Sequence, residues 1–152
     1  MPASPSPRPA GDASPQMPVS ARVAVALLAT LAVLLLLYVV ITWLGRDGLL
    51  EVLTEAGLTR AEAEQYVIVN TAAPAVLGLV FAVSAWALGS RRSWGRWTGV
   101  AAAAVLGLLV LSTMVTAGGI TVISLLLLVL SIAAATSLLA QPTREWLAPA
   151  RG

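Results

Sequence analysis

The sequence contains neither cysteine nor histidine, so two of the most reactive side chains are missing. Their absence excludes disulfides, thiolate or imidazole metal ligands and imidazole acid–base catalysis. Charged residues are also scarce, at 11% of the chain, whereas a soluble domain has about 25%. Hydrophobic residues make up 59%, which leaves too little polar surface for a soluble globular protein. We therefore predict no catalytic residue, no cofactor site and no metal site.

The basic residues do not form a nucleic-acid surface. All nine of them are arginine, they are scattered in small groups, and the net charge is only +2. Nucleic-acid binding would need a basic stripe or patch. We predict that the chain has no nucleic-acid partner and that its arginines determine its orientation in a lipid bilayer.

Four long apolar runs dominate what remains. They cover residues 23–44, 66–88, 97–117 and 120–141. A helix needs about 20 apolar residues to cross a hydrocarbon core about 30 Å thick. The sequence therefore predicts an all-α polytopic membrane protein, a bundle of four transmembrane helices. Only Gly118 and Gly119 separate the last two runs, and one helix over both would be about 67 Å long, so we expect a tight turn there.

The segments between and beside these runs are short. Residues 1–20 hold six of the nine prolines among alanine and serine, a composition typical of a disordered tail. Residues 21–142 form the predicted membrane domain, with loops at 45–65 and 89–96, and residues 143–152 form a second tail.

The distribution of charge predicts the orientation. Seven of the nine arginines lie before the first run, in loop 89–96 or after the last run, whereas loop 45–65 contains two arginines and five acidic residues. Because cytoplasmic loops carry the excess of basic residues, both termini are predicted in the cytoplasm and loop 45–65 outside the plasma membrane.

Loop 45–65 begins with an amphipathic pattern. At 100° per residue, the apolar side of a helix would carry Leu49, Leu50, Val52, Leu53 and Ala56. The other side would carry Asp47, Glu51, Thr54 and Glu55. We expect an outer interfacial amphipathic helix that lies on lipid or on other helices. Its three carboxylates are candidates for binding another envelope protein, and the alternative is a merely solvated face.

Local signals set the helix boundaries that follow. Gly57 is a typical helix end, and Thr59 with Glu62 forms the capping box that starts the next helix. Pro74 removes the hydrogen bond that the carbonyl of Asn70 would accept, so we expect a structural kink near the start of the second run, close to the membrane interface.

Small residues recur at helical spacing on the second and third runs. They are Gly78, Ala82, Ala85, Gly89, Gly99, Ala103 and Gly107. Small residues let helix backbones approach closely in lipid. We expect the two runs to pack against each other through these residues, and the alternative is a homodimer that uses the same face.

Uncharged polar residues gather toward the predicted outer ends of the runs. The candidate cluster contains Asn70, Thr71, Ser112, Thr116, Thr121 and Ser124. Either these residues line a shallow vestibule for a neutral ligand or a lipid headgroup, or each bonds to its own helix backbone, which we expect. No charged residue lies within a run, although proton-coupled carriers usually need one there.

The proline-rich start, the RRSWGRW loop and the QPTREW ending resemble those of a loose class of small, uncharacterised four-span membrane proteins of high-GC Gram-positive bacteria. The resemblance implies a plasma membrane location and transfers no active site. We expect a non-enzymatic structural or regulatory subunit of the cell envelope that contacts the bilayer and a protein partner. The alternative is a transporter or channel component for an uncharged or lipid-like solute.

Overall fold

The computed structural model describes residues 17–117 and 121–147, and every regular element within these ranges is a helix. The elements are α1 (Val19–Leu44), α2 (Arg46–Glu55), α3 (Arg60–Gly89), α4 (Trp94–Ala117), α5 (Val122–Leu139) and α6 (Gln141–Leu147). Four of them, α1, α3, α4 and α5, are long and apolar enough to cross a membrane. The predicted all-α four-helix bundle is therefore confirmed.

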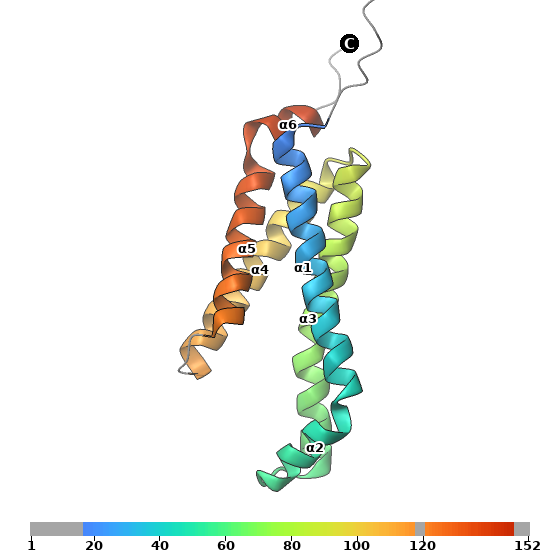
Figure 1. Ribbon diagram of the computed structural model, residues 1–152, viewed down its shortest axis with the longest axis vertical. Coiled ribbons are helices and arrows are strands. Elements are labelled where there is room, and N and C mark those ends of the chain that lie inside the picture. The colour runs from blue at the N-terminus through green and yellow to red at the C-terminus, as the bar shows by residue number, and fades with distance from the viewer. Residues whose placement is uncertain (1–16, 118–120, 148–152) are drawn as a thin grey trace, which may run out of the picture.

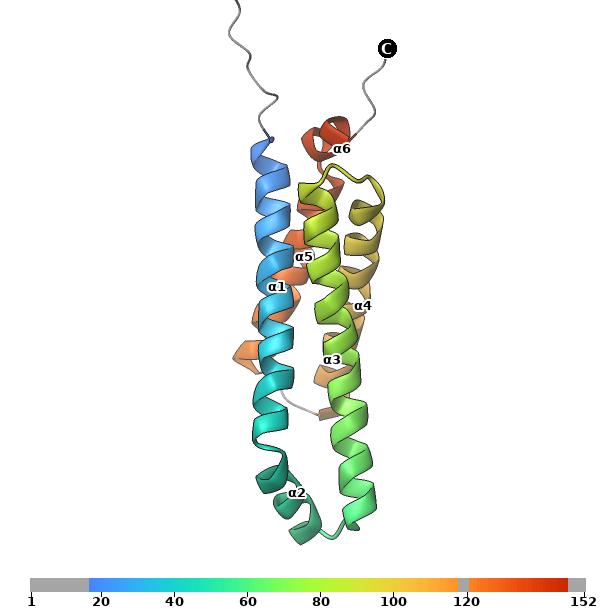
Figure 2. The same cartoon turned by 90° about the vertical axis from the view of Figure 1, so that its right-hand side faces the viewer.

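The bundle consists of two helical hairpins. α1 packs mainly on α3, and α4 packs mainly on α5 (Figure 1). The turn between α3 and α4 lies at the same end as α6, and α2 lies at the opposite end (Figure 2). The four long helices are in contact near the α6 end, whereas the α4/α5 hairpin leans away from α1 and α3 toward the α2 end.

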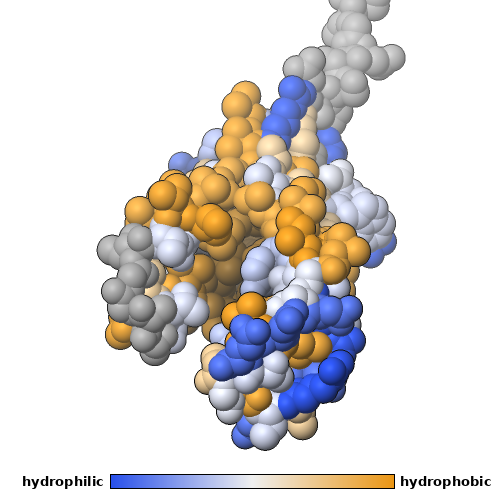
Figure 3. All heavy atoms as spheres, turned by 60° about the horizontal axis from the view of Figure 1, so that its bottom comes forward, coloured by the Kyte–Doolittle hydropathy of each residue, from blue (hydrophilic) through white to orange (hydrophobic). Residues whose placement is uncertain are grey.

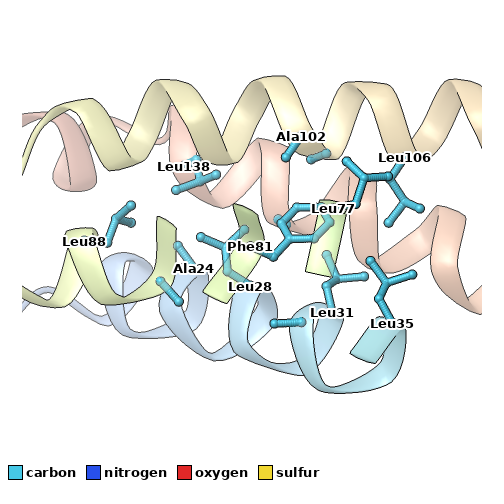
Figure 4. Close-up of a cluster of buried hydrophobic side chains, with 14 of the residues drawn as sticks. Ala24, Leu28, Leu31, Leu35, Leu77, Phe81, Leu88, Ala102, Leu106 and Leu138 are labelled. Carbon is cyan, nitrogen blue, oxygen red and sulfur yellow. The ribbon is translucent and has the colours of Figure 1, made fainter. Parts of the chain in front are cut away.

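The core occupies the half of the bundle nearer α6. Buried side chains run only as far as Leu35 along α1, and on α5 they begin at Ser131. Phe81 of α3 is fully buried between side chains of the other three long helices (Figure 4). Because lipid is as apolar as leucine, close packing rather than removal of water holds such a core together.

The helix α5 is shorter than α1, beside which it packs. The Thr143 hydroxyl donates to the Ser20 hydroxyl at 3.0 Å, which fixes the start of α1 beside the end of α5. From that level α1 continues for 26 residues and α5 for 18, about 39 Å and about 27 Å at 1.5 Å per residue. Because the α4/α5 hairpin also leans away from α1 and α3, an apolar hollow lies between the two hairpins when the bundle is viewed from the α2 end (Figure 3).

The predicted helix boundaries around α2 and α3 are confirmed. Gly57 has a φ of 99° and ends α2, and the Leu58 amide donates to the Leu53 carbonyl at 3.2 Å. The Glu62 amide donates to the Thr59 hydroxyl at 3.3 Å, while the Thr59 amide donates to the Glu62 carboxylate at 2.8 Å. Both halves of the capping box are present. α3 continues through Pro74 without ending.

The described part of the predicted C-terminal tail, which starts at residue 143, is helical. α5 ends at Leu139, and α6 begins at Gln141 with Pro142 in its first turn, where a missing amide is tolerated. Leu147 is buried, and the Thr143 hydroxyl also contacts the Ser137 carbonyl at 3.1 Å. Residues 1–16, the predicted Gly118–Gly119 turn and residues 148–152 lie outside the described residues.

Candidate functional site at the α2 end

α2 is held on the first turns of α3 by a small apolar cluster. We call residues 46–67 the α2 cap. Leu50 of α2 is buried against Ala63 and Val67 of α3, which are buried as well. Leu49, Leu53 and Leu58 are half-buried around them. The amphipathic helix predicted from the sequence is therefore present, and it lies on a neighbouring helix.

Val52 departs from the predicted apolar side. Its side chain is 61% exposed, whereas that of Leu50 is 4% exposed. Two residues correspond to about 200° around a helix, so Val52 points away from α3 once Leu50 faces it. Ala56 is exposed as well, because α2 ends in the turn at Gly57.

The two arginines of the cap share one carboxylate. The Arg46 and Arg60 guanidinium groups each lie 3.6 Å from the same oxygen of Glu64. Arg46 also lies over the Trp43 ring, 5.4 Å from its centroid. These contacts occupy the basic residues of the cap with a carboxylate that is not part of the acidic side of α2.

The candidate carboxylates of Asp47, Glu51 and Glu55 remain exposed and form no ion pair with any described residue. They lie four residues apart along α2 and so follow one side of it. An open depression of about 310 Å³ is lined by two of these carboxylates, those of Asp47 and Glu51, together with Leu50, Thr54 and Arg60.

The described residues of the α2 cap contain no group of side chains that could bind a metal ion. Within residues 17–117 and 121–147, no group of three or more carboxylates is arranged to hold an ion.

The candidate polar cluster is bonded locally wherever its contacts are described. The Thr71 hydroxyl donates to the Val67 carbonyl at 2.7 Å, and the side-chain Nδ2 of Asn70 donates to the Tyr66 carbonyl at 2.9 Å. The Thr121 hydroxyl accepts a hydrogen bond from the Ser124 amide at 3.1 Å and thus caps α5.

The other two members of that cluster lie on α4. Ser112 is exposed, and the Thr116 side chain lies outside the described part of the structure. The α4/α5 hairpin leans away from α3 at this depth (Figure 1). The hydrogen bonds of Asn70, Thr71 and Thr121 thus stay within one helix or at a helix end, as expected for polar groups that bond locally.

Five of the seven small residues pack inside the bundle, and the two glycines among them contact helices other than the predicted partner. A Cβ atom on Gly78 would lie 3.0 Å from Leu36 of α1, and one on Gly99 would lie 3.0 Å from Leu138 of α5. Ala85 and Ala103 belong to the core, and Ala82 is partly buried against it. Gly89 and Gly107 have open space where a side chain would be.

The close approach of α3 and α4 occurs at Gly95, which the sequence analysis missed. A Cβ atom there would lie 2.7 Å from the Ala87 Cβ. One turn further along α4, the Thr98 and Ser84 hydroxyls form a hydrogen bond of 3.0 Å between the two helices. Gly95 and Gly99 lie four residues apart, and this spacing indicates close helix contacts but does not identify the partner helix of each glycine.

Searches against protein-family models, curated proteins and solved structures found no match to this chain.

Proposed function

We propose that this chain is a small multi-pass plasma membrane protein, a non-enzymatic structural or regulatory subunit that presents the α2 cap to a basic surface of another envelope protein. One observation carries the proposal. Buried Leu50 fixes α2 on α3, while the Asp47, Glu51 and Glu55 carboxylates on its other side stay exposed and unpaired among the described residues. A fixed helix loses little conformational freedom on binding, which favours affinity.

The proposed orientation places the α2 cap outside the cell and both termini in the cytoplasm. The turn between α3 and α4 carries Arg91 and Arg92, and the first turn of α4 carries Arg96, whereas the α2 end is acidic. Basic residues accumulate in cytoplasmic loops, which supports this choice. We assign no catalytic role, because the sequence has no charged residue between Glu64 and Arg91 or between Arg96 and Arg144.

The orientation can be tested without removing any native cysteine, since the chain has none. A single cysteine at the exposed position Ala56 is expected to react with a membrane-impermeant maleimide in intact cells. A cysteine at exposed Ser93 is expected to react only after permeabilisation. The opposite labelling pattern would reverse the proposed inside and outside faces.

The partner surface is tested by neutralising the three carboxylates with Asp47→Asn, Glu51→Gln and Glu55→Gln together. We expect unchanged insertion and thermal stability but loss of a defined cross-linked species that the parent forms through a photoreactive residue at Thr54. Glu145→Gln is the control, because this exposed carboxylate lies on α6 at the other end. If the triple variant keeps every species that the parent forms, the acidic side of α2 is only a solvated face.

A second function, a transporter or channel component for an uncharged or lipid-like solute, is favoured by the apolar hollow between the hairpins (Figure 3). A hollow that binds a lipid-like solute should be labelled saturably by a photoactivatable lipid, and excess unlabelled lipid should displace it. Labelling that never saturates would indicate ordinary surrounding lipid and exclude this function.

A further inference from the structure

Arginine–tryptophan contacts occur at both ends of the bundle. At the α2 end, Arg46 lies over Trp43. At the other end, Arg92 lies over Trp86 at 5.3 Å and Arg96 lies over Trp97 at 5.2 Å. The Trp86 and Trp97 side chains are 60% and 63% exposed. The two guanidinium groups are thus held against aromatic rings on the outer surface of the bundle, where a membrane would contact them.

The turn between α3 and α4, which carries Arg92 and leads to Arg96 in α4, has a defined backbone. The Arg92 amide donates to the Ala87 carbonyl at 2.9 Å, and the Arg91 amide donates to the Leu88 carbonyl at 3.1 Å. With Arg91 at a φ of 57°, this is a Schellman motif at the end of α3. The Gly95 amide then donates to the Arg92 carbonyl at 3.2 Å. The motif fixes where Arg92 and Arg96 leave the backbone.

The counter-ions differ between the two ends. Arg46 has the Glu64 carboxylate at 3.6 Å in addition to its tryptophan. Arg92 and Arg96 form no ion pair with any described residue. The described part of the chain places one acidic residue, Glu145, at this end, and it is exposed and forms no ion pair with another described residue. A guanidinium stacked on an indole keeps its full charge and its planar donors, so an anion from outside the chain can fill the role that Glu64 has for Arg46.

We propose that Arg92 with Trp86 and Arg96 with Trp97 bind the phosphate of anionic phospholipids in the leaflet at this end of the bundle. We call these four residues the loop surface. Arginine binds phosphate through paired N–H groups, and tryptophan rings settle at the headgroup level beside the glycerol and upper acyl chain. Anionic lipids attract basic residues near the cytoplasmic surface, which is where the proposed orientation places the loop surface. The α2 cap is not involved.

The test compares the purified full-length chain in phosphatidylcholine nanodiscs with and without phosphatidylglycerol. We expect phosphatidylglycerol to raise the thermal unfolding midpoint of the parent and to remain bound in native mass spectrometry. Arg92→Gln with Arg96→Gln should reduce the affinity for phosphatidylglycerol by about thirtyfold, since each arginine near an anionic surface contributes a factor of about five. The matched control, Arg46→Gln with Arg60→Gln, removes the same charge at the α2 end and should keep the parent's affinity.

A second variant keeps the test decisive if the glutamine variant does not fold. Arg92→Lys with Arg96→Lys retains the charge but loses the paired donors and the planar stack, so it should bind phosphatidylglycerol more weakly than the parent. Equal binding by the parent and this variant would overturn the phosphate geometry. Equal loss in the α2-end control would reduce the effect to net charge, which also contradicts the proposal.

Inorganic phosphate added to the protein in lipid-free detergent distinguishes the source of the phosphate group. We expect it to leave the unfolding midpoint unchanged, because the proposed site uses the tryptophans to contact the rest of the lipid. Stabilisation by inorganic phosphate as large as that by phosphatidylglycerol would identify a free-anion site and refute the assignment to lipid.

Discussion

The close contact between α3 and α4 makes Gly95→Ala the most informative stability test. The added methyl would lie 2.7 Å from the Ala87 Cβ and 3.2 Å from the Leu88 backbone nitrogen. Carbon atoms normally approach to about 3.5–4.0 Å, and neither of these atoms is the end of a flexible side chain. The two helices must therefore separate, and such overpacking typically costs about 1–3 kcal/mol.

A matched control on the same helix removes the effect of intrinsic helix propensity. Gly107→Ala also replaces a glycine of α4, but nothing lies within 4 Å of its new Cβ. That variant should be as stable as the parent or more stable by up to about 1 kcal/mol. The difference between the two variants then measures the contact itself and should be about 1–3 kcal/mol.

The assay is reversible unfolding in mild detergent, followed by the fluorescence of the tryptophans, of which Trp86, Trp94 and Trp97 lie near the contact in sequence. A second readout uses the Ser84–Thr98 hydrogen bond of 3.0 Å beside the contact. Ser84→Ala should cost about 0.6 kcal/mol in the parent and nothing in the Gly95→Ala background, where the helices have separated. Equal stability of Gly95→Ala and Gly107→Ala would refute the close approach of α3 and α4.

Two further predictions concern the helix ends and the core. Arg91 and Gly57 both have positive φ at the end of a helix. Arg91→Gly should therefore stabilise the protein by about 1 kcal/mol, and Gly57→Ala should destabilise it by a similar amount. A shift of the thermal unfolding midpoint in the same direction for both variants would contradict this. The Ser131 hydroxyl is buried and has no hydrogen-bond partner among the described residues. Ser131→Ala should therefore be at least as stable as the parent in the same assay, and a loss above about 1 kcal/mol would show that the hydroxyl has a partner.

Signals contained within one stretch of chain were sufficient to predict the helices and most of their ends. The capping box at Thr59 and the glycine at Gly57 act through hydrogen bonds within a few residues, and both were predicted. Hydropathy placed the start of the second span at Tyr66, whereas α3 begins at Arg60 because nothing interrupts the helix that the capping box starts. The apolar part and the helical part of a segment need not begin together.

The short helix α6 could not be predicted in this way. Its seven residues are too few for a stable isolated helix. Burial of Leu147 and the contact of Thr143 with Ser20, at the other end of the described chain, hold it in place. Neither contact leaves a local pattern in the sequence.

The sequence also could not predict which neighbouring helix each small residue contacts. In a soluble helix the apolar stripe shows which face meets the core, but α3 and α4 are apolar on the faces toward lipid and toward neighbouring helices alike. The rotation of each helix about its own axis is therefore not encoded in hydropathy. Gly78 consequently contacts α1 and Gly99 contacts α5 and α1, although both were expected at the α3–α4 interface.

The acidic side of α2 can be separated from the needs of the fold by its energetics. Asp47 and Glu51, and then Glu51 and Glu55, are like charges four residues apart, and each pair disfavours the helix by about 0.2–0.5 kcal/mol. Asp47 in the first turn gains from the helix dipole by about 0.3–1 kcal/mol, whereas Glu55 in the last turn loses a similar amount. The two dipole effects cancel, so the like-charge pairs leave the sum unfavourable by about 0.4–1 kcal/mol, while Leu50, packed on α3, holds the helix in place. Neutralising all three carboxylates should consequently leave the free energy of unfolding equal to that of the parent or raise it by up to about 1 kcal/mol. A loss of more than about 1 kcal/mol on chemical unfolding would assign these carboxylates to the fold, and their presence would no longer argue for a partner.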